Sequence, residues 1–157
     1  MIRPKVTWID EHTPELKGKI LATVSMEGYI AEMTGDAREA NVRGGLGIYF
    51  GDKLEGLKAI GMDKAFGCMP LYKKRLIQSI RKGRQHIEYK DVSYEDQPIE
   101  RVTDSQGKPM QFDVWGWDEE NTAQDRQYRT EVYSICRGGT PLYLFYCPEV
   151  FDVLYPD

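Results

Sequence analysis

The chain has 157 residues, a formal net charge of −4, and 41% hydrophobic and 29% charged residues. This composition excludes a disordered chain, a fibre and a disulfide-dense miniprotein, and the length fits a single domain over residues 1–157. No apolar run approaches the ~18 residues that span a bilayer, and the N-terminus has no apolar signal region, so no membrane partner is expected. Three widely spaced cysteines predict reduced thiols in a cytoplasmic protein.

The charge is distributed unevenly along the chain. Residues 73–90 contain seven Lys or Arg and one Asp or Glu, a net charge of +6, whereas residues 91–157 carry −9. The negative total argues against general nucleic-acid binding. A cationic segment of this kind can nevertheless hold one anionic ligand.

The first elements in chain order mix strand and helix patterns. Residues 5–9 (KVTWI) are a run of β-formers and predict a short strand. Pro14 stands where a helix can begin, and apolar residues at helical spacing favour a helix over residues 15–26 that stops at Gly28. The same run also fits a strand. Residues 34–45 are polar and end in glycine, which predicts a loop.

The middle of the chain predicts one strand and two helices. Residues 46–50 (LGIYF) read as a short buried strand. Asp52 and Glu55 have the spacing of a capping box, which would open a short helix. A second helix is predicted from Pro70 to Gly83, with apolar side chains on one face and cations on the other.

The C-terminal half predicts β-structure. The expected strands are 85–94 with a bulge, 99–103 and 110–117 around the turn DSQGKP, and 127–136 and 141–147 around Gly138-Gly139. Helical spacing is also present within 127–136, but its density of Thr, Val, Tyr and Ile favours a strand. The sequence therefore predicts an α+β domain with mostly antiparallel, split β-sheets and two to three short helices in its N-terminal half.

Simple chemical motifs are scarce. The GGLG segment lacks the Lys-Ser/Thr of a phosphate-binding loop, and the chain has no GxSxG motif. With two histidines and no CxxC pair, no metal site is expected.

Three features become informative when they are taken in order. His12-Thr13 follows the first predicted strand, GLGIYFGD covers residues 45–52, and Glu131 precedes a turn and the segment PLYL. This order resembles the ADP-ribosyltransferases of the His-Tyr-Glu kind, the group of poly-ADP-ribose polymerases and diphtheria-like toxins. The segment KILATVSMEGY, residues 19–29, is similar in kind to the helix that follows the histidine in that family.

The resemblance implies NAD as the substrate and assigns roles to individual residues. Tyr49 would stack on the nicotinamide ring, His12 would hydrogen-bond a ribose hydroxyl, and Glu131 would stabilise the oxocarbenium-like state as the glycosidic bond breaks. Thr13, Gly47 and Phe66 would complete the NAD site. Thr13 departs from the family, in which a glycine follows the histidine and binds the nicotinamide amide through its backbone.

Two functions of different classes follow from these observations. The resemblance implies an NAD-dependent mono-ADP-ribosyltransferase acting on a macromolecular target, which could be a phage or mobile-element effector against host defence. The alternative is a non-catalytic acidic inhibitor that blocks a nucleic-acid-handling protein. The cationic segment suggests nucleic-acid contacts through Lys74, Arg75, Arg81, Lys82 and Arg84, although a solvated charged face is the simpler interpretation.

Overall fold

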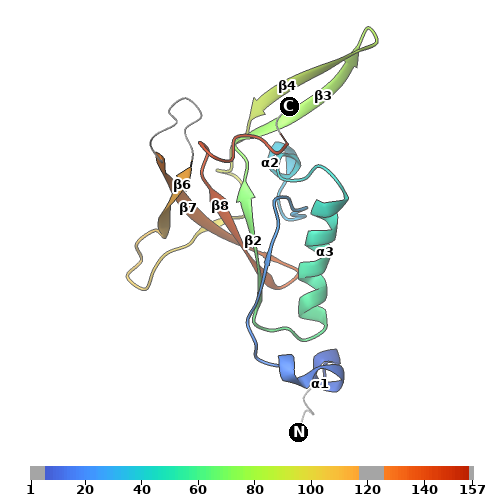
Figure 1. Cartoon of the computed structure of the whole chain (residues 1–157), viewed down its shortest axis with the longest axis vertical. Coiled ribbons are helices and arrows are strands. Elements are labelled where there is room, and N and C mark those ends of the chain that lie inside the picture. Colours follow the sequence, from blue (N-terminus) through green and yellow to red (C-terminus); the bar gives the residue numbers. More distant parts are fainter. Residues whose placement is uncertain (1–5, 117–125, 156–157) are drawn as a thin grey trace.

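The structure, a computed structural model, describes residues 6–116 and 126–155, and its body is a six-stranded sheet (Figure 1). The strands are β1 (Leu21–Val24), β2 (Ala65–Leu71), β8 (Thr140–Tyr146) and β7 (Arg126–Arg137), in this spatial order, with β5 (Glu100–Arg101) and β6 (Gln111–Gly116) both paired to β7. The β1–β2 and β2–β8 pairs are parallel, whereas every pair that includes β7 is antiparallel. The predicted α+β class is confirmed.

Helix α3 (Gly45–Ala59) covers one face of this sheet (Figure 1). Its buried residues recur at helical spacing and are Gly47, Phe50, Gly51, Leu54 and Leu57. A stripe of this kind seals a helix against a sheet, and Leu54 is fully buried against the sheet residues Met69 and Leu144. Gly51 permits a close approach, because a Cβ atom there would lie 2.7 Å from the carbonyl oxygen of Tyr29.

The expected strand at residues 46–50 is wrong, because the whole segment belongs to α3. The β-forming Ile48 and Tyr49 face solvent on this helix, and burial of Phe50 and Leu54 outweighs their local preference. Asp52 is an exposed residue inside α3 rather than an N-cap, and the cap is Gly44.

The N-terminal segment also differs from the prediction. The predicted strand over residues 5–9 is wrong for its described part, because residues 8 and 9 begin helix α1 (Trp8–His12), which Thr7 and Asp10 start with a capping box. Lys5, the first residue of the predicted strand, lies outside the described residues. Helix α1 is joined to the end of α3 by the N–H of Ile9, which donates to the carbonyl of Ile60 at 3.1 Å.

The predicted helix over residues 15–26 is wrong, and the strand alternative is correct. A single 3₁₀ turn, η1 (Pro14–Leu16), begins at the proline, and β1 follows. Gly18, with φ of +73°, breaks the helical path between them. The predicted loop at 34–45 contains a short helix, α2 (Gly35–Ala40).

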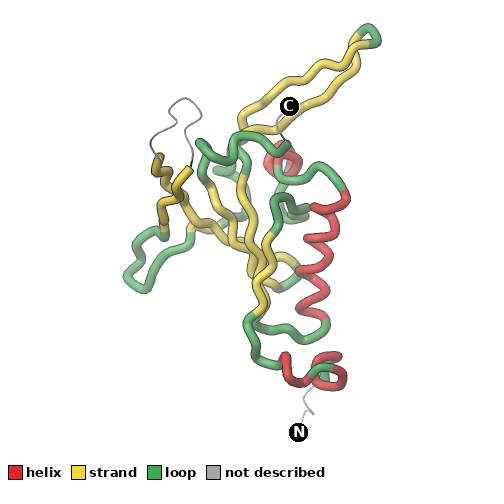
Figure 2. The backbone as a smooth tube through the Cα atoms, viewed as in Figure 1, coloured by secondary structure: helices red, strands yellow, loops and turns green. Residues whose placement is uncertain are grey.

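A two-stranded hairpin projects from the body (Figures 1 and 2) and is called the arm below. It consists of β3 (Lys74–Arg81) and β4 (Arg84–Asp91), which pair along their whole length. The predicted helix from Pro70 to Gly83 is therefore wrong. Pro70 and Leu71 instead end β2, where they pair with Phe145 and Tyr146 of β8.

The C-terminal half follows the prediction closely. Strands β7 and β8 form the expected hairpin around Gly138 and Gly139, both at positive φ, and the helical alternative for 127–136 is wrong. Strand β4 pairs in regular register over 84–91, with no bulge. Strands β5 and β6 are shorter than expected, and Trp117 lies outside the described residues. The hairpin expected between them is wrong, because both strands pair with β7 and only an isolated bridge joins Thr103 to Pro109.

The cysteines and the helices complete the description of the fold. Cys68, Cys136 and Cys147 are free thiols, and Cys147 is buried. Within residues 6–116 and 126–155, no helix combines the length and the hydropathy that crossing a membrane requires.

Candidate functional site

The turn at the end of the arm is set by two residues in the left-handed region. Lys82 and Gly83 have φ of +51° and +73°, and Arg81 pairs directly with Arg84 across them. Two-residue turns with both φ values positive match the twist of an antiparallel ribbon, and glycine in the second position is typical of them. The arm is therefore a regular, tightly closed β-ribbon rather than an irregular loop.

The cations at the base of the arm are neutralised by the body. Arg75 is ion-paired with Asp36 and Glu39 of α2, and Lys90 is also ion-paired with Asp36. Lys74 Nζ lies 2.9 Å from the carboxylate of Asp152. These pairs, together with the hydrogen bond from Arg43 to the carbonyl of Leu76 at 2.9 Å, fix the direction in which the arm leaves the body.

The pKa values follow from these contacts. The ammonium of Lys90 and the guanidinium of Arg75 hold the pKa of Asp36 below its usual range. The hydrogen bond to Asp152 raises the pKa of Lys74. Both shifts favour the charged forms, so the base of the arm remains an ion-paired network at neutral pH.

The tip of the arm has a different charge balance. Arg81 is paired with Glu88 at 2.8 Å, but the side chains of Lys82 and Arg84 have no ion pair or hydrogen bond with any described residue. Arg81 and Arg84 also lie directly opposite each other, and like charges in this position destabilise a β-ladder. An external anion at the tip would relieve this repulsion.

The two faces of the arm differ in chemistry. The register places one set of side chains on a common face, and Glu88 is the single acidic residue of that face: Arg75, Ile77, Ser79, Arg81, Arg84, His86, Glu88 and Lys90. Ile80 and Ile87 lie on the opposite face. Ile80 is the next-to-last residue of β3, close to the tip, and it is 81% exposed. The arm thus combines a cationic face with an exposed aliphatic side chain at its end.

The residues assigned to an NAD site occupy separate parts of the molecule. His12 is exposed on α1, with its ring stacked on Trp8 at 4.6 Å between centroids. Thr13 closes α1, and its N–H donates to the carbonyl of Ile9. Helix α1 packs at the C-terminal end of α3, which is Ala59. Tyr49 lies ten residues before Ala59, and this separates it from that end by about 15 Å along the helix axis.

Tyr49 and Glu131 also point in different directions. Tyr49 is 62% exposed and lies on the side of α3 away from the sheet. Glu131 lies on β7 and shares a sheet face with Ile135, because side chains four residues apart on a strand point to the same side. Ile135 belongs to the core between this face and α3. Among the described residues, no hydrogen bond or ring contact joins His12, Tyr49 and Glu131.

The remaining two assigned residues are packed into the body. Gly47 is buried, and a Cβ atom there would lie 2.6 Å from the side chain of Val42. Phe66 lies on the sheet face opposite α3, with its ring edge-on to that of Tyr143 at 5.7 Å between centroids. The Phe66 side chain is therefore separated by the sheet from α3, which carries Tyr49.

Glu131 itself takes part in a well-formed polar cluster. It accepts hydrogen bonds from the Tyr133 hydroxyl at 2.7 Å and from the Gln111 amide at 3.4 Å, and it is ion-paired with Arg101. This cluster lies at the edge of a tyrosine-lined pocket. The Glu131 carboxylate is therefore held in place, and its oxygens already accept from protein groups rather than being free for a ligand hydroxyl.

Comparison with known proteins does not supply a family. No protein-family model matches the chain, and no curated protein matches it in sequence. The resemblance to ADP-ribosyltransferases therefore stays a prediction.

Sequence reasoning found the cations of the arm but missed their arrangement. The signal for a hairpin was present, because Lys82-Gly83 is flanked by two runs of eight residues that each contain Ile and have an arginine next to the turn. The helical spacing of Leu76, Ile77 and Ile80 hid it.

Proposed function

We propose that the protein is a non-catalytic binding protein whose arm engages the phosphate backbone of nucleic acid. The observation that carries this proposal is the contrast between the paired cations at the base of the arm and the unpaired cations of Lys82 and Arg84 at its tip. A two-stranded ribbon has the width to enter the major groove of duplex DNA, and phosphate contacts from Lys and Arg position such elements.

The charge of the body restricts how such a complex forms. Residues 74–91, which form the arm and its turn, carry a net charge of +4, so the remainder of the chain has a net charge of −8. A phosphate backbone would be repelled by this body and attracted only by the arm. The proposed complex is therefore a tip contact with few phosphates, not a broad electrostatic footprint.

Of the five cations that the sequence suggested as contacts, three suit this role. Arg81, Lys82 and Arg84 lie at the tip, whereas Lys74 and Arg75 are paired at the base. Binding through two to three phosphates predicts that log K falls with log salt with a slope of about −2 to −3, since each neutralised phosphate contributes about −0.9.

The test is fluorescence anisotropy with a labelled duplex at several salt concentrations. The double variant Lys82→Gln/Arg84→Gln should lower both the affinity and the salt slope. The matched control, Lys64→Gln/Lys108→Gln, removes the same charge from exposed lysines outside the arm and should leave the slope unchanged. No binding at low salt, or equal effects of the two double variants, would contradict the proposal.

The transferase hypothesis makes a separate prediction. Incubation with labelled NAD and a lysate would give transfer or nicotinamide release that is lost in Glu131→Ala. The geometry favours the binding role over this activity, because Tyr49 and Glu131 face different surroundings.

A further inference from the structure

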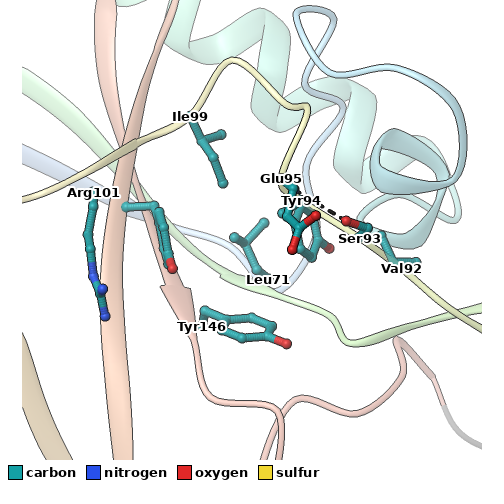
Figure 3. A pocket seen from close by; sticks show the side chains of 9 residues that line it. Leu71, Val92, Ser93, Tyr94, Glu95, Ile99, Arg101 and Tyr146 are labelled. Atoms are coloured by element: carbon teal, nitrogen blue, oxygen red, sulfur yellow. Dashed lines mark hydrogen bonds between the residues drawn. The ribbon is translucent and has the colours of Figure 1, made fainter.

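A pocket of about 600 Å³ opens beside the ends of β2 and β8 and the middle of β7, away from the arm tip. The segment 92–99 closes one side of it, and Arg101 of β5 stands at another. In Figure 3 the side chains of Ile99, Leu71 and Tyr146 point into the same space, with Arg101 on one side and Ser93 on the other. This volume is in the range of small-molecule sites.

Three tyrosine rings form walls of this pocket. The Tyr94 and Tyr146 rings lie 6.1 Å apart between centroids at an interplanar angle of 69°, so they make two nearly perpendicular walls. Tyr133 adds a third aromatic side chain, and the fully buried Leu71 contributes an apolar surface between them. We refer to this tyrosine-lined part of the pocket as the cage.

Hydrogen bonds hold two of these rings in place. The Tyr94 hydroxyl donates to the carbonyl of Tyr72 at 2.7 Å and accepts from the amide of Asn41 at 2.9 Å. The Tyr133 hydroxyl donates to Glu131 at 2.7 Å. The cage is therefore preorganised, which reduces the entropy that a ligand would lose on binding.

The charges around the cage are mostly negative. Glu95 lines the pocket, and the one lining cation, Arg101, is ion-paired with Glu131. Burial raises the pKa of the Tyr146 hydroxyl, and the carboxylates of Glu131, Glu149 and Asp91 raise it further. The tyrosines therefore stay neutral and present their rings in an electronegative environment.

We propose that this pocket binds a small organic cation of the quaternary or alkylated ammonium class. Such a cation is attracted to the faces of aromatic rings and is weakly hydrated, so it enters an apolar cage at low cost. Glu95 supplies a counter-charge on the rim. An anion is disfavoured because Arg101 is already neutralised, and a neutral ligand would gain nothing from the carboxylates.

The test uses choline as the probe and compares it with its neutral isostere, the alcohol in which a tert-butyl group replaces the trimethylammonium group. Titration followed by NMR of the tyrosine ring protons should show choline binding at least about tenfold more tightly than the isostere. Equal affinities would show simple apolar burial and would overturn the proposal. Binding of benzoate in preference to choline, or no shift of the Tyr133 and Tyr146 signals with choline, would also overturn it.

Variants separate the ring contribution from the charge. Tyr146→Phe keeps the aromatic face and should retain choline binding, whereas Tyr146→Leu should abolish it. Because Tyr146 packs against the core, the melting temperature of each variant is measured alongside. Glu95→Gln alters an exposed residue and should weaken choline about two- to fivefold without affecting the isostere. Unchanged choline affinity in both Tyr146→Leu and Glu95→Gln would contradict the proposal.

Discussion

The body is stabilised mainly by a buried apolar core, whereas the outer half of the arm is held mainly by the hydrogen bonds between its two strands. In the body, helix α3 and the sheet bury a continuous cluster in which Leu54, Met69 and Leu144 are fully inaccessible. In the arm, the outer half consists of two strands held by their own ladder, with Ile80, Arg81 and Arg84 exposed. Free energy from apolar burial is therefore concentrated in the body.

Because of this difference, we expect substitutions in the core of the body to lower stability more than substitutions in the outer half of the arm. An isolated two-stranded ribbon is at best marginally stable in water, so the arm depends on the body for its orientation. Its base is joined to α2 and to the C-terminal segment by ion pairs and backbone hydrogen bonds. The tip is free of the core, and its side chains are available for contacts with a partner.

The largest expected effect comes from matched truncations in the two regions. Leu54→Ala should reduce the free energy of unfolding by about 2–5 kcal/mol, because it leaves a cavity in a fully buried site. Ile80→Ala, at an 81% exposed position, should change it by no more than about 0.5 kcal/mol. Urea denaturation measures both values. Comparable losses would mean that the end of the arm is packed against something in solution.

A buried amide provides the second comparison. Asn41 is fully buried, donates to the Ala37 carbonyl at 2.6 Å and to the Tyr94 hydroxyl, and accepts from the N–H of Tyr72 at 3.2 Å. Asn41→Leu should cost about 1–3 kcal/mol, because it leaves the Tyr72 N–H without a partner. Gln85→Leu changes an exposed amide of the arm and serves as the control. Thermal unfolding of the two variants should differ clearly, and equal shifts would contradict this assignment.

The parts of the fold that the sequence predicts well are those in which local pattern and tertiary context agree. The β7–β8 hairpin has alternating β-formers, and Gly138 and Gly139 supply positive φ at its turn. Both the strand preference and the turn preference point to the same structure. The confirmed strands of the C-terminal half are of this kind.

The parts that it does not predict are those in which long-range packing decides. Residues 46–50 are β-formers, yet the small Gly47 and Gly51 alternate with large apolar residues at helical spacing, which suits a helix pressed on a sheet. The sequence of residues 15–26 fits both a helix and a strand, and pairing with β2 makes residues 21–24 a strand. The pocket was missed for a related reason, since Tyr94 lies about 40 to 50 residues before Tyr133 and Tyr146 in the chain. The β7–β8 register brings Tyr133 and Tyr146 together, and hydrogen bonds of the Tyr94 hydroxyl to Asn41 and Tyr72 hold Tyr94 beside them.

A third test asks whether the arm opens independently of the body. Gly83→Ala places a side chain at φ of +73° in open space, so it should strain the turn by about 1–2 kcal/mol without a clash. We expect faster amide hydrogen exchange in β3 and β4 and unchanged exchange in β2 and β8. Gly107→Ala, at a similar φ of +77° in another exposed turn, is the control and should leave the arm unaffected. Faster exchange throughout the sheet in Gly83→Ala would show one cooperative unit.

The smallest effect concerns Asp36, which connects the arm to the body. Because Lys90 and Arg75 lower its pKa in the folded state, Asp36 contributes stability that is present above its unfolded pKa and is lost as pH falls through the folded value. Asp36→Asn should therefore lower stability at neutral pH, by about 0.2–1 kcal/mol because the pairs are partly exposed.

The pH dependence separates this electrostatic contribution from a packing defect. The difference in unfolding free energy between the wild type and Asp36→Asn should begin to shrink as pH falls below about 4, where Asp36 of the unfolded chain takes up a proton. It should disappear once the pH is below the lowered pKa of Asp36 in the folded protein, where both states are protonated. Asp96→Asn removes an exposed carboxylate that has no ion pair among the described residues, so it should give little difference at any pH. A deficit in Asp36→Asn that persists in acid would mean that Asp36 supports the base of the arm through its shape and hydrogen bonds, and that the direction of the arm does not depend on charge.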